Sequence, residues 1–361
     1  MEKTLSIIVP TYNMEKYLCK CLDSLIVSDE NMQLLEVLVI NDGSKDSSSQ
    51  IAHEYEAKYP QTFRVIDKEN GNYGSCINRG LKEATGKYVK VLDADDSFDA
   101  KVLENYICFL DNVDVDLIIS DFNVVNENGA CLSEFTFNLP MNKPFSLQDI
   151  PEEMNTFLFH QSITYKRDVF GRFTYHQTEG ISYTDDEWIF EPMLWIESAL
   201  YYPHTLYLYL RGREGQTFDP NVIKRTLEHR VIVAKEMTEF HEANIRFCKT
   251  ENVPFVTEKL ARRIKVVYNY HLILYNTAEN RHRIIDFDRY LKQKSIKVYD
   301  EINMMTNNYG WHYIRQWRKL GYSNCSPALV FIRLKRYIDR KLNGKTVKIG
   351  KMPAHLKRKE I

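Results

Sequence analysis

The sequence predicts an α/β fold in which a mostly parallel central sheet is covered by helices on both faces. Short apolar runs recur along the first third of the chain, and segments with helical spacing separate them. Polar residues follow directly after several of these runs. Near-continuous apolar strands are typical of a sheet that is buried on both faces, and their alternation with helices favours parallel connections.

The expected strands and helices alternate up to residue 122. The strands are expected at 5–9, 34–40, 63–67, 87–93 and 115–122. The first helix is expected to follow Asn13 as its N-cap, because apolar residues then recur at helical spacing. The later helices are expected at 45–59, 75–84 and 99–110.

Three polar segments follow expected strands, and they predict a binding site. They are P-T-Y-N (10–13), N-D-G-S (41–44) and D-A-D-D (93–96). In open α/β sheets, ligands bind outside the carboxyl ends of the strands, so these three segments should meet at one edge. The last two carry carboxylates, which makes the predicted site acidic.

Composition indicates a folded protein of a reducing compartment. The 361 residues are 44% hydrophobic and 27% charged, which is enough apolar material for a large core. The seven cysteines are scattered without a C-x-x-C pair, so neither a zinc site nor a disulfide framework is indicated. The N-terminus has no signal-peptide pattern, and no apolar run reaches the ~18–20 residues of a membrane span. We therefore expect a cytoplasmic, non-spanning protein.

Charge is distributed unevenly along the chain. The net charge is −1, yet residues 311–361 hold 14 Lys and Arg against two acidic residues. Residues 1–310 therefore carry a net charge of −13. The basic C-terminal segment is expected to face an anionic partner, such as a membrane or a phosphorylated ligand.

The run V-L-D-A-D-D-S-F (91–98) places Asp93, Asp95 and Asp96 together. Carboxylates this close repel and resist desolvation, so a positive partner should offset the cost. The chain has neither G-x-G-x-x-G after its first strand nor a G-x-x-x-x-G-K-[ST] loop, so a bound diphosphate needs another positive partner. A Mn²⁺ or Mg²⁺ ion held by carboxylate and phosphate oxygens meets that need. The alternative is a solvated turn.

The motifs taken together resemble those of family 2 nucleotide-sugar glycosyltransferases with the GT-A fold. The resemblance covers residues 5–98 through P-T-Y-N, V-L-V-I-N-D-G-S-K-D and N-R-G-L-K-E-A-T-G-K-Y-V-K-V-L-D-A-D-D. It continues less tightly through 157–219, with Y-T-D-D-E-W-I-F and Y-L-Y-L-R-G-R-E-G-Q-T-F. It implies a role in bacterial cell-surface polysaccharide synthesis.

The resemblance also implies a GT-A domain at 1–220, with a nucleotide-sugar-binding half at 1–121 and an acceptor-binding half at 122–220. Nothing specific to the family is found beyond about 220. Helical spacing and basic composition predict a mainly helical, basic region at 221–361.

The resemblance assigns donor-site roles to the residues that match its motifs. Asp42 would accept from the uracil imide of a UDP-sugar, Asp93 would contact the ribose, and Asp95 would bind the metal ion. Asp96 would support this site without binding the ion. The base pocket would be lined by Pro10, Tyr12 and Asn13.

One motif departs from the family pattern. Many members carry A-R-N-x-G where this chain has C-I-N-R-G, so Ile77 stands in the arginine's place. Asn72 or Arg79 is the expected substitute in donor binding.

Asp185, Asp186 and Glu187 begin an apolar-rich segment that is expected to be helical. Acidic residues in a first helical turn are favoured by the helix dipole, so capping is one explanation. The family places its general base in such a pair, and the resemblance implies Asp186 for this role. Two nearby histidines, His160 and His176, are expected to be structural rather than acceptor contacts.

The segment R-G-R-E-G-Q-T (211–217) supplies further candidates for ligand contacts. An arginine can hold phosphate oxygens bidentately, and glycines let backbone amides approach a ligand. Arg213, Gln216 and Thr217 are the candidates for the donor diphosphate or a phosphorylated acceptor. A solvated loop is the alternative.

The sequence pattern predicts that the C-terminal region, 221–361, is helical and basic. Two segments, 311–322 and 328–342, mix aromatic, aliphatic and basic residues. That composition suits a helix lying in a membrane interface, and the alternative is a helical extension packed on the catalytic domain. No nucleic-acid recognition motif is present, so no nucleic-acid partner is expected.

The prediction is therefore a metal-dependent, inverting glycosyltransferase. It would move a sugar from a UDP-sugar to a hydroxyl of a glycan or lipid-linked saccharide, at the cytoplasmic face of the membrane. Two alternatives stay open. A non-catalytic sugar-nucleotide-binding or scaffold protein would use Asp42 and Asp93 alone, and a nucleotidyltransferase would need a glycine- and arginine-rich loop that 10–16 lacks.

Overall fold

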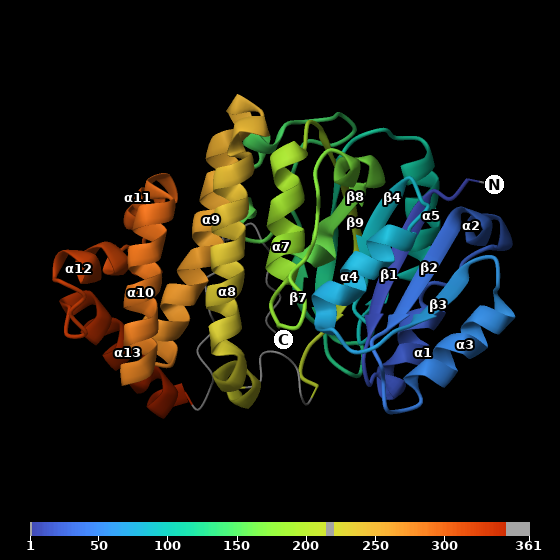
Figure 1. Cartoon of the computed structure of the whole chain (residues 1–361). Helices are drawn as coiled ribbons and strands as arrows, with labels where there is room; N and C mark the ends of the chain where they lie inside the picture. Colours follow the sequence, from blue (N-terminus) through green and yellow to red (C-terminus); the bar gives the residue numbers. More distant parts are fainter. Residues whose placement is uncertain (1, 214–219, 344–361) are drawn as a thin grey trace.

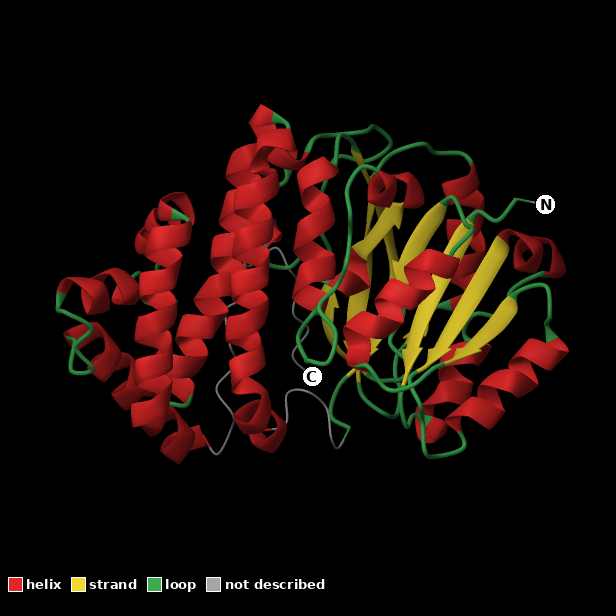
Figure 2. Cartoon of the chain, in the orientation of Figure 1, coloured by secondary structure: helices red, strands yellow, loops and turns green. Residues whose placement is uncertain are grey.

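The computed structural model describes residues 2–213 and 220–343. A nine-stranded sheet fills one side of the molecule and a group of helices forms the other (Figures 1 and 2). The strands are β1 (Leu5–Thr11), β2 (Leu35–Asn41), β3 (Phe63–Asp67), β4 (Tyr88–Val91), β5 (Ser97–Phe98), β6 (Leu117–Val125), β7 (Cys131–Phe135), β8 (Ile163–Lys166) and β9 (Ala199–Leu210).

Helices separate the strands and then continue alone. Those among the strands are α1 (Glu15–Asp23), α2 (Asp29–Leu34), α3 (Ser48–Lys58), α4 (Asn72–Glu83), α5 (Ala100–Asp111), α6 (Glu152–Asn155) and α7 (Asp185–Phe190). Those after the last strand are α8 (Pro220–Asn244), α9 (Val253–Tyr268), α10 (Ala278–Lys294), α11 (Ile296–Met304), α12 (Tyr313–Lys319) and α13 (Pro327–Asn343).

The first half of the sheet has the parallel order β3-β2-β1-β4. Every residue of β2 is buried, as a strand covered on both faces should be. The chain moves from β1 outward to β3 and then returns across the sheet to β4. Because such crossovers are right-handed, the returning helix α4 covers the face opposite α1 and α3, and Figure 1 shows it crossing the front.

This strand order places a topological switch point between β1 and β4, because β2 lies on one side of β1 and β4 on the other. Ligands of open α/β sheets bind at such a point, outside the carboxyl ends of the strands. Beyond β4 the sheet is mixed. There β8 runs antiparallel to both β4 and β6, while β6 and β9 are parallel.

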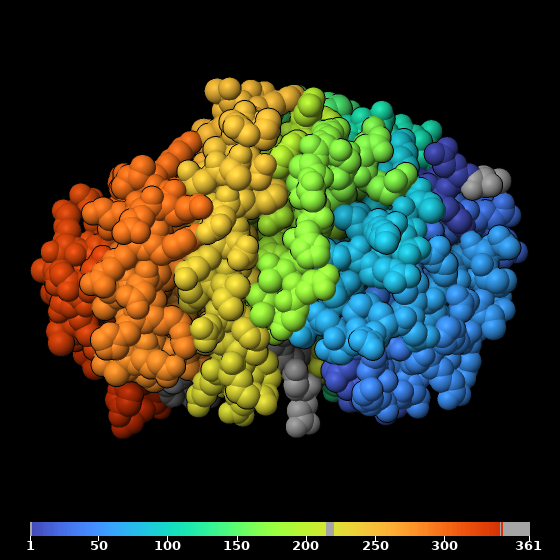
Figure 3. Space-filling model, viewed as in Figure 1, coloured from blue at the N-terminus to red at the C-terminus, as the bar shows by residue number. Residues whose placement is uncertain are grey.

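The helices after β9 share a core with the sheet. Buried apolar residues from α8 to α13 belong to the same hydrophobic cluster as those of β1 and β2. Figure 3 shows these C-terminal helices, coloured yellow to red, as one end of the molecule. No helix within 2–213 and 220–343 is long and apolar enough to cross a bilayer.

Two local predictions differ from the structure. The helix expected after Asp185 ends at Phe190 and tightens into a 3₁₀ turn at Glu191–Trp195. Pro192 explains this end, since proline lacks the amide that an α-helix needs at that position. Asn13 does not cap α1. The N-cap position is Met14, and Asn13 adopts a left-handed backbone with φ of 52°.

Candidate functional site

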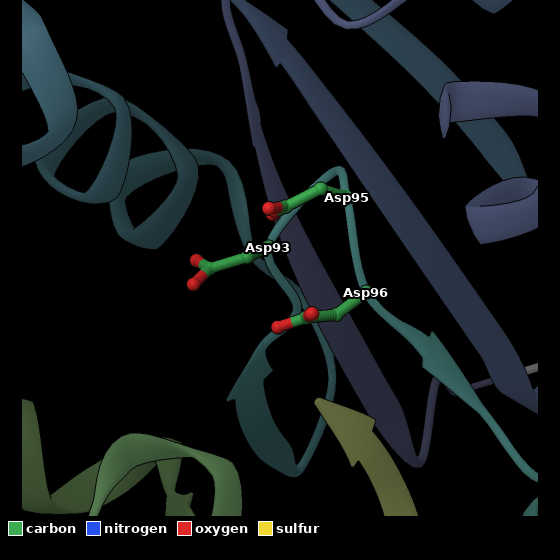
Figure 4. Close-up of side chains that lie close together, drawn as sticks. All are labelled: Asp93, Asp95 and Asp96. Atoms are coloured by element: carbon green, nitrogen blue, oxygen red, sulfur yellow. The ribbon is translucent and has the colours of Figure 1, made fainter. Parts of the chain in front are cut away.

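The aspartates at 93–96 form an acidic cluster in the loop after β4. Figure 4 shows the three carboxylates turned to the same side of this loop. One oxygen from each of Asp93, Asp95 and Asp96 lies within 4.8 Å of the others. Such a set of hard oxygen donors fits a divalent cation such as Mg²⁺ or Mn²⁺.

The three carboxylates differ in how they are bonded. Asp96 is buried and accepts from the Tyr207 hydroxyl at 2.6 Å and the Leu210 amide at 2.7 Å, so β9 holds it in place. Burial and the charges of Asp95 and Asp93 raise its pKa well above the usual value. Asp95 forms an ion pair with Arg213.

Asp93 retains an unused ligand atom. Its Oδ1 is buried without a hydrogen-bond partner among the described residues, and its Oδ2 lies 3.2 Å from Nε2 of His160. Burial raises the pKa of Asp93, but the charge and polar contact of His160, the neighbouring Tyr73 hydroxyl and the charge of Arg213 together outweigh that effect and lower it overall. An oxygen left without a partner in this way supports the fit of the cluster to a cation.

A carboxylate outside the acidic cluster, that of Asp42, directly follows β2. Its Oδ1 accepts from Lys68 Nζ at 2.5 Å and from the Gly71 amide at 2.9 Å. Lys68 follows β3, so the carboxyl end of this third strand also contributes to the site. The sequence offered a signal for Lys68, because a polar segment follows this strand as it follows the others.

The residues expected to line the base pocket lie in β1 and the loop after it. Pro10 pairs with Ile40 inside the sheet, and Tyr12 is 45% exposed. The Asn13 side chain accepts from the Lys45 amide at 2.7 Å, which ties this loop to the loop after β2. These two loops therefore lie side by side, as predicted from the parallel strands.

The two residues expected to replace the missing arginine are placed differently. Asn72 begins α4 at the carboxyl edge, with a left-handed φ of 66°. Arg79 lies two turns further along α4 and pairs with Glu83 at 3.0 Å on the surface. The structure therefore does not bring Arg79 to the acidic cluster, and Ile77 is fully buried.

The acidic residues at the start of α7 divide between three environments. Glu187 is buried and accepts from the amide and hydroxyl of Thr178 at 2.6 and 2.7 Å. Asp186 lies 3.0 Å from Nη1 of Arg263, which comes from α9. Asp185 has a pKa raised to about 6 by burial and by the charge of Asp186.

Asp185 lies on the side of the acidic cluster. The charge of His160 lowers the pKa of Asp185, and the charge of Asp93 raises it. Burial, then the charge of Asp93, then that of Asp185 raise the pKa of the Tyr73 hydroxyl. The Tyr73 hydroxyl is buried without a hydrogen-bond partner among the described residues. Tyr73 and His160 thus join the site from α4 and from the turn before β8, a part of the arrangement that the sequence did not predict.

The loop before α7 is fixed against α4. Asn78 donates to the Gln177 carbonyl and accepts from the Gln177 amide, both at 2.8 Å. At Gly74 a Cβ atom would lie 2.0 Å from the Thr178 carbonyl oxygen, so only glycine permits this close approach. Helix α4 thereby positions the acidic start of α7.

The predicted phosphate contacts are described only in part. Arg213 pairs with Asp95, and its guanidinium lies 5.5 Å from the centre of the Tyr17 ring. Gln216 and Thr217 lie outside the described residues.

Comparison with known proteins gives a family match and several relatives. The sequence model for "Glycosyl transferase family 2" matches residues 6–173. The minor teichoic acid biosynthesis protein GgaB of Bacillus subtilis (strain 168) is 38% identical over 106 residues, or 29% of this chain and 12% of GgaB. The poly(ribitol-phosphate) β-N-acetylglucosaminyltransferase TarS of Staphylococcus aureus (strain Mu50) is 33% identical over 135 residues, or 37% of this chain and 24% of TarS.

An uncharacterized glycosyltransferase of Mycoplasma genitalium, MG025, is 38% identical over 126 residues, or 34% of this chain and 41% of that protein. The matched segments thus span less than half of each of these relatives. The crystal structure of S. aureus TarS 1–349 in complex with UDP-GlcNAc superposes with a TM-score of 0.67 at 18% identity, covering 96% of this chain and 97% of that one. This superposition establishes the fold.

Proposed function

This chain belongs to glycosyl transferase family 2 through residues 6–173, and we propose that it transfers a sugar from a UDP-sugar to a hydroxyl of a glycan or lipid-linked saccharide. One observation carries the proposal. At the switch point of the sheet, one carboxylate oxygen from each of Asp93, Asp95 and Asp96 lies within 4.8 Å of the others, and the charge of Asp93 raises the pKa of Asp185 at the start of α7. The relatives GgaB and TarS, named for teichoic acid and poly(ribitol-phosphate), support a cell-surface polysaccharide as the product.

The donor would bind over the carboxyl ends of β1, β2 and β4. The base would lie against Pro10, Tyr12 and Asn13, with Asp42 accepting from it and Asn72 closing the pocket. TarS structures that contain UDP-GlcNAc or UDP support uridine as the nucleoside. Lys68 takes part by orienting the Asp42 carboxylate through their 2.5 Å hydrogen bond.

A Mn²⁺ or Mg²⁺ ion would be held by Asp95 together with the free oxygen of Asp93. When bound, such an ion supplies positive charge next to the departing diphosphate. Arg213 neutralises Asp95 in the present structure, and it would turn to the phosphate oxygens of the donor.

The transfer itself would be a single displacement with inversion. The acceptor oxygen forms a bond to the anomeric carbon while the bond from that carbon to the diphosphate oxygen breaks. The hydroxyl proton passes to a carboxylate at the start of α7. Asp186, the residue predicted for this role, forms an ion pair with Arg263. We therefore assign the role of general base to Asp185, whose pKa is raised to about 6.

We test the donor site by calorimetric titration of the protein with UDP, with and without Mn²⁺. The protein should bind UDP more tightly with Mn²⁺, and Asp95→Ala should lose that gain while keeping its fold. Equal affinity with and without Mn²⁺, together with an unaffected variant, would contradict the metal assignment.

For the location of the reaction, we propose the cytoplasmic face of the membrane, where a lipid-linked acceptor would present its saccharide. The basic composition of residues 311–361 supports this placement.

A further inference from the structure

Helix α13 has two apolar faces, and only one of them is used inside the protein. Ala328, Leu329 and Ile332 are buried against the body of the molecule. A second stripe of large apolar residues points to solvent, each between 40% and 56% exposed, and consists of Val330, Phe331, Leu334, Tyr337 and Ile338. Their spacing of one, three and four residues places them on one face of the helix.

Aromatic side chains from the preceding loop extend this stripe. The ring centre of Phe331 lies 4.7 Å from that of Trp311 and 5.8 Å from that of Tyr309. Both partners are exposed, at 39% and 46%. Of the 14 large apolar residues exposed in the described ranges, seven belong to this stripe and its two aromatic neighbours, so the exposed apolar residues are concentrated here.

Basic side chains border the patch. A pocket of about 340 Å³ beside Trp311 is lined by Arg315 and Lys319 as well as His312. Lys341 lies 5.0 Å from the centre of the Tyr337 ring, so its ammonium stands over the aromatic stripe. The sequence from 311 onward has 14 Lys and Arg against two acidic residues.

We propose that this α13 surface, formed by Tyr309, Trp311 and the exposed stripe of α13, docks on an anionic lipid bilayer. Tyrosine and tryptophan favour the headgroup level of a membrane, aliphatic side chains enter the acyl boundary, and Lys and Arg pair with lipid phosphates. The excess of basic residues matches an anionic surface by charge. This inference rests on the proposed function for the position of the lipid-linked acceptor, and it adds the surface and the lipid chemistry that would hold the protein beside that acceptor.

Within residues 311–342, the structure shows which part exposes apolar side chains for contact with a membrane. Helix α12 carries part of the mixed pattern expected to contact a membrane, but Tyr313, Ile314 and Trp317 are buried in the core. Their side chains therefore stabilise the helical region, and the exposed apolar area belongs to α13 and its preceding loop.

The test is co-sedimentation of the full chain with vesicles of phosphatidylglycerol and phosphatidylcholine, against vesicles of phosphatidylcholine alone. The test variant combines Phe331→Ser, Leu334→Ser and Tyr337→Ser. The matched control combines Phe247→Ser, Ile296→Ser and Met304→Ser, which removes three equally exposed apolar side chains elsewhere. Neither variant changes the net charge.

Wild type and the control should bind the anionic vesicles and not the neutral ones, and the α13 variant should bind about tenfold more weakly or worse. Failure of the wild type to bind anionic vesicles, or wild-type binding by the α13 variant, overturns the proposal. Sedimentation velocity gives a third outcome that also overturns it, namely a wild-type dimer that the α13 variant loses. UDP titration of the same variant should be unchanged, which separates this surface from the donor site.

Discussion

At the scale of single residues, the site is organised by which carboxylate oxygens are already bonded. Both oxygens of Asp96 accept from β9, so this residue shapes the loop rather than offering ligands. Oδ1 of Asp93 has no hydrogen-bond partner among the described residues, and Asp95 forms an ion pair with Arg213. Asp185 and Asp186 of α7 differ in the same way, since Asp186 forms an ion pair with Arg263.

This difference leads to a prediction for the general base. Asp185→Asn should lower kcat by roughly 10²- to 10⁴-fold, because that is the usual contribution of a positioned base. Asp186→Asn should lower kcat much less. Steady-state kinetics with a UDP-sugar checks this, and calorimetry should show unchanged UDP affinity in both variants. The reverse ranking would return the base role to Asp186.

The raised pKa of Asp185 predicts a pH profile. A base acts in its ionised form, so kcat should rise with pH through a midpoint of about 6 and then level off. In Asp186→Asn the neighbouring negative charge is removed, and the midpoint should therefore move to lower pH. Initial rates between pH 5 and 8, measured at saturating donor, test both statements; an unmoved midpoint would point to another titrating group.

At the scale of secondary-structure elements, contacts between α4, α7 and α9 decide where the acidic start of α7 lies. Asn78 and Gly74 of α4 hold the loop before α7 from one side. Arg263 of α9 reaches Asp186 from the other side, and the side chains of this pair are only 14% and 17% exposed. The helical region thus contacts the acidic start of α7 directly, through the Arg263–Asp186 ion pair.

Removing this ion pair should cost stability. Arg263→Met leaves Asp186 partly buried without its partner, and the unfolding free energy should fall by about 1–3 kcal/mol. Urea unfolding measures the change. The double variant with Asp186→Asn should recover part of the loss, since the unpaired charge is then gone. A double variant that is no more stable than Arg263→Met alone would argue against the charge as the cause.

At the scale of the whole molecule, one hydrophobic core joins the sheet to the helices that follow it. The superposition on S. aureus TarS 1–349 extends over 96% of this chain, so the helical region belongs to the shared fold and not only the sheet. The proposed donor site lies on the sheet, the Arg263–Asp186 ion pair joins α9 to the start of α7, and α13 lies at the opposite side of the molecule (Figure 1). The proposed donor site, general base and docking surface therefore lie on different elements, so each can be altered by itself.

The sequence by itself determined which segments form the parallel strands of the first half and which polar residues follow them. Apolar runs and the polar residues after them are local patterns, so the parallel strands and the clustering of 10–13, 41–44 and 93–96 at one edge followed from periodicity and a general rule of α/β sheets. The family was identified from the same segments, and the match to residues 6–173 confirms it.

Only the tertiary structure decided which side chains meet. Lys68 reaches Asp42 across 26 positions and Arg213 reaches Asp95 across 118, and no local spacing encodes either pair. The same holds for the two apolar stripes of α13, whose residues have similar hydrophobicity. Packing against the rest of the molecule buried one stripe and left the other exposed, because burial depends on what surrounds a helix and not on the helix alone.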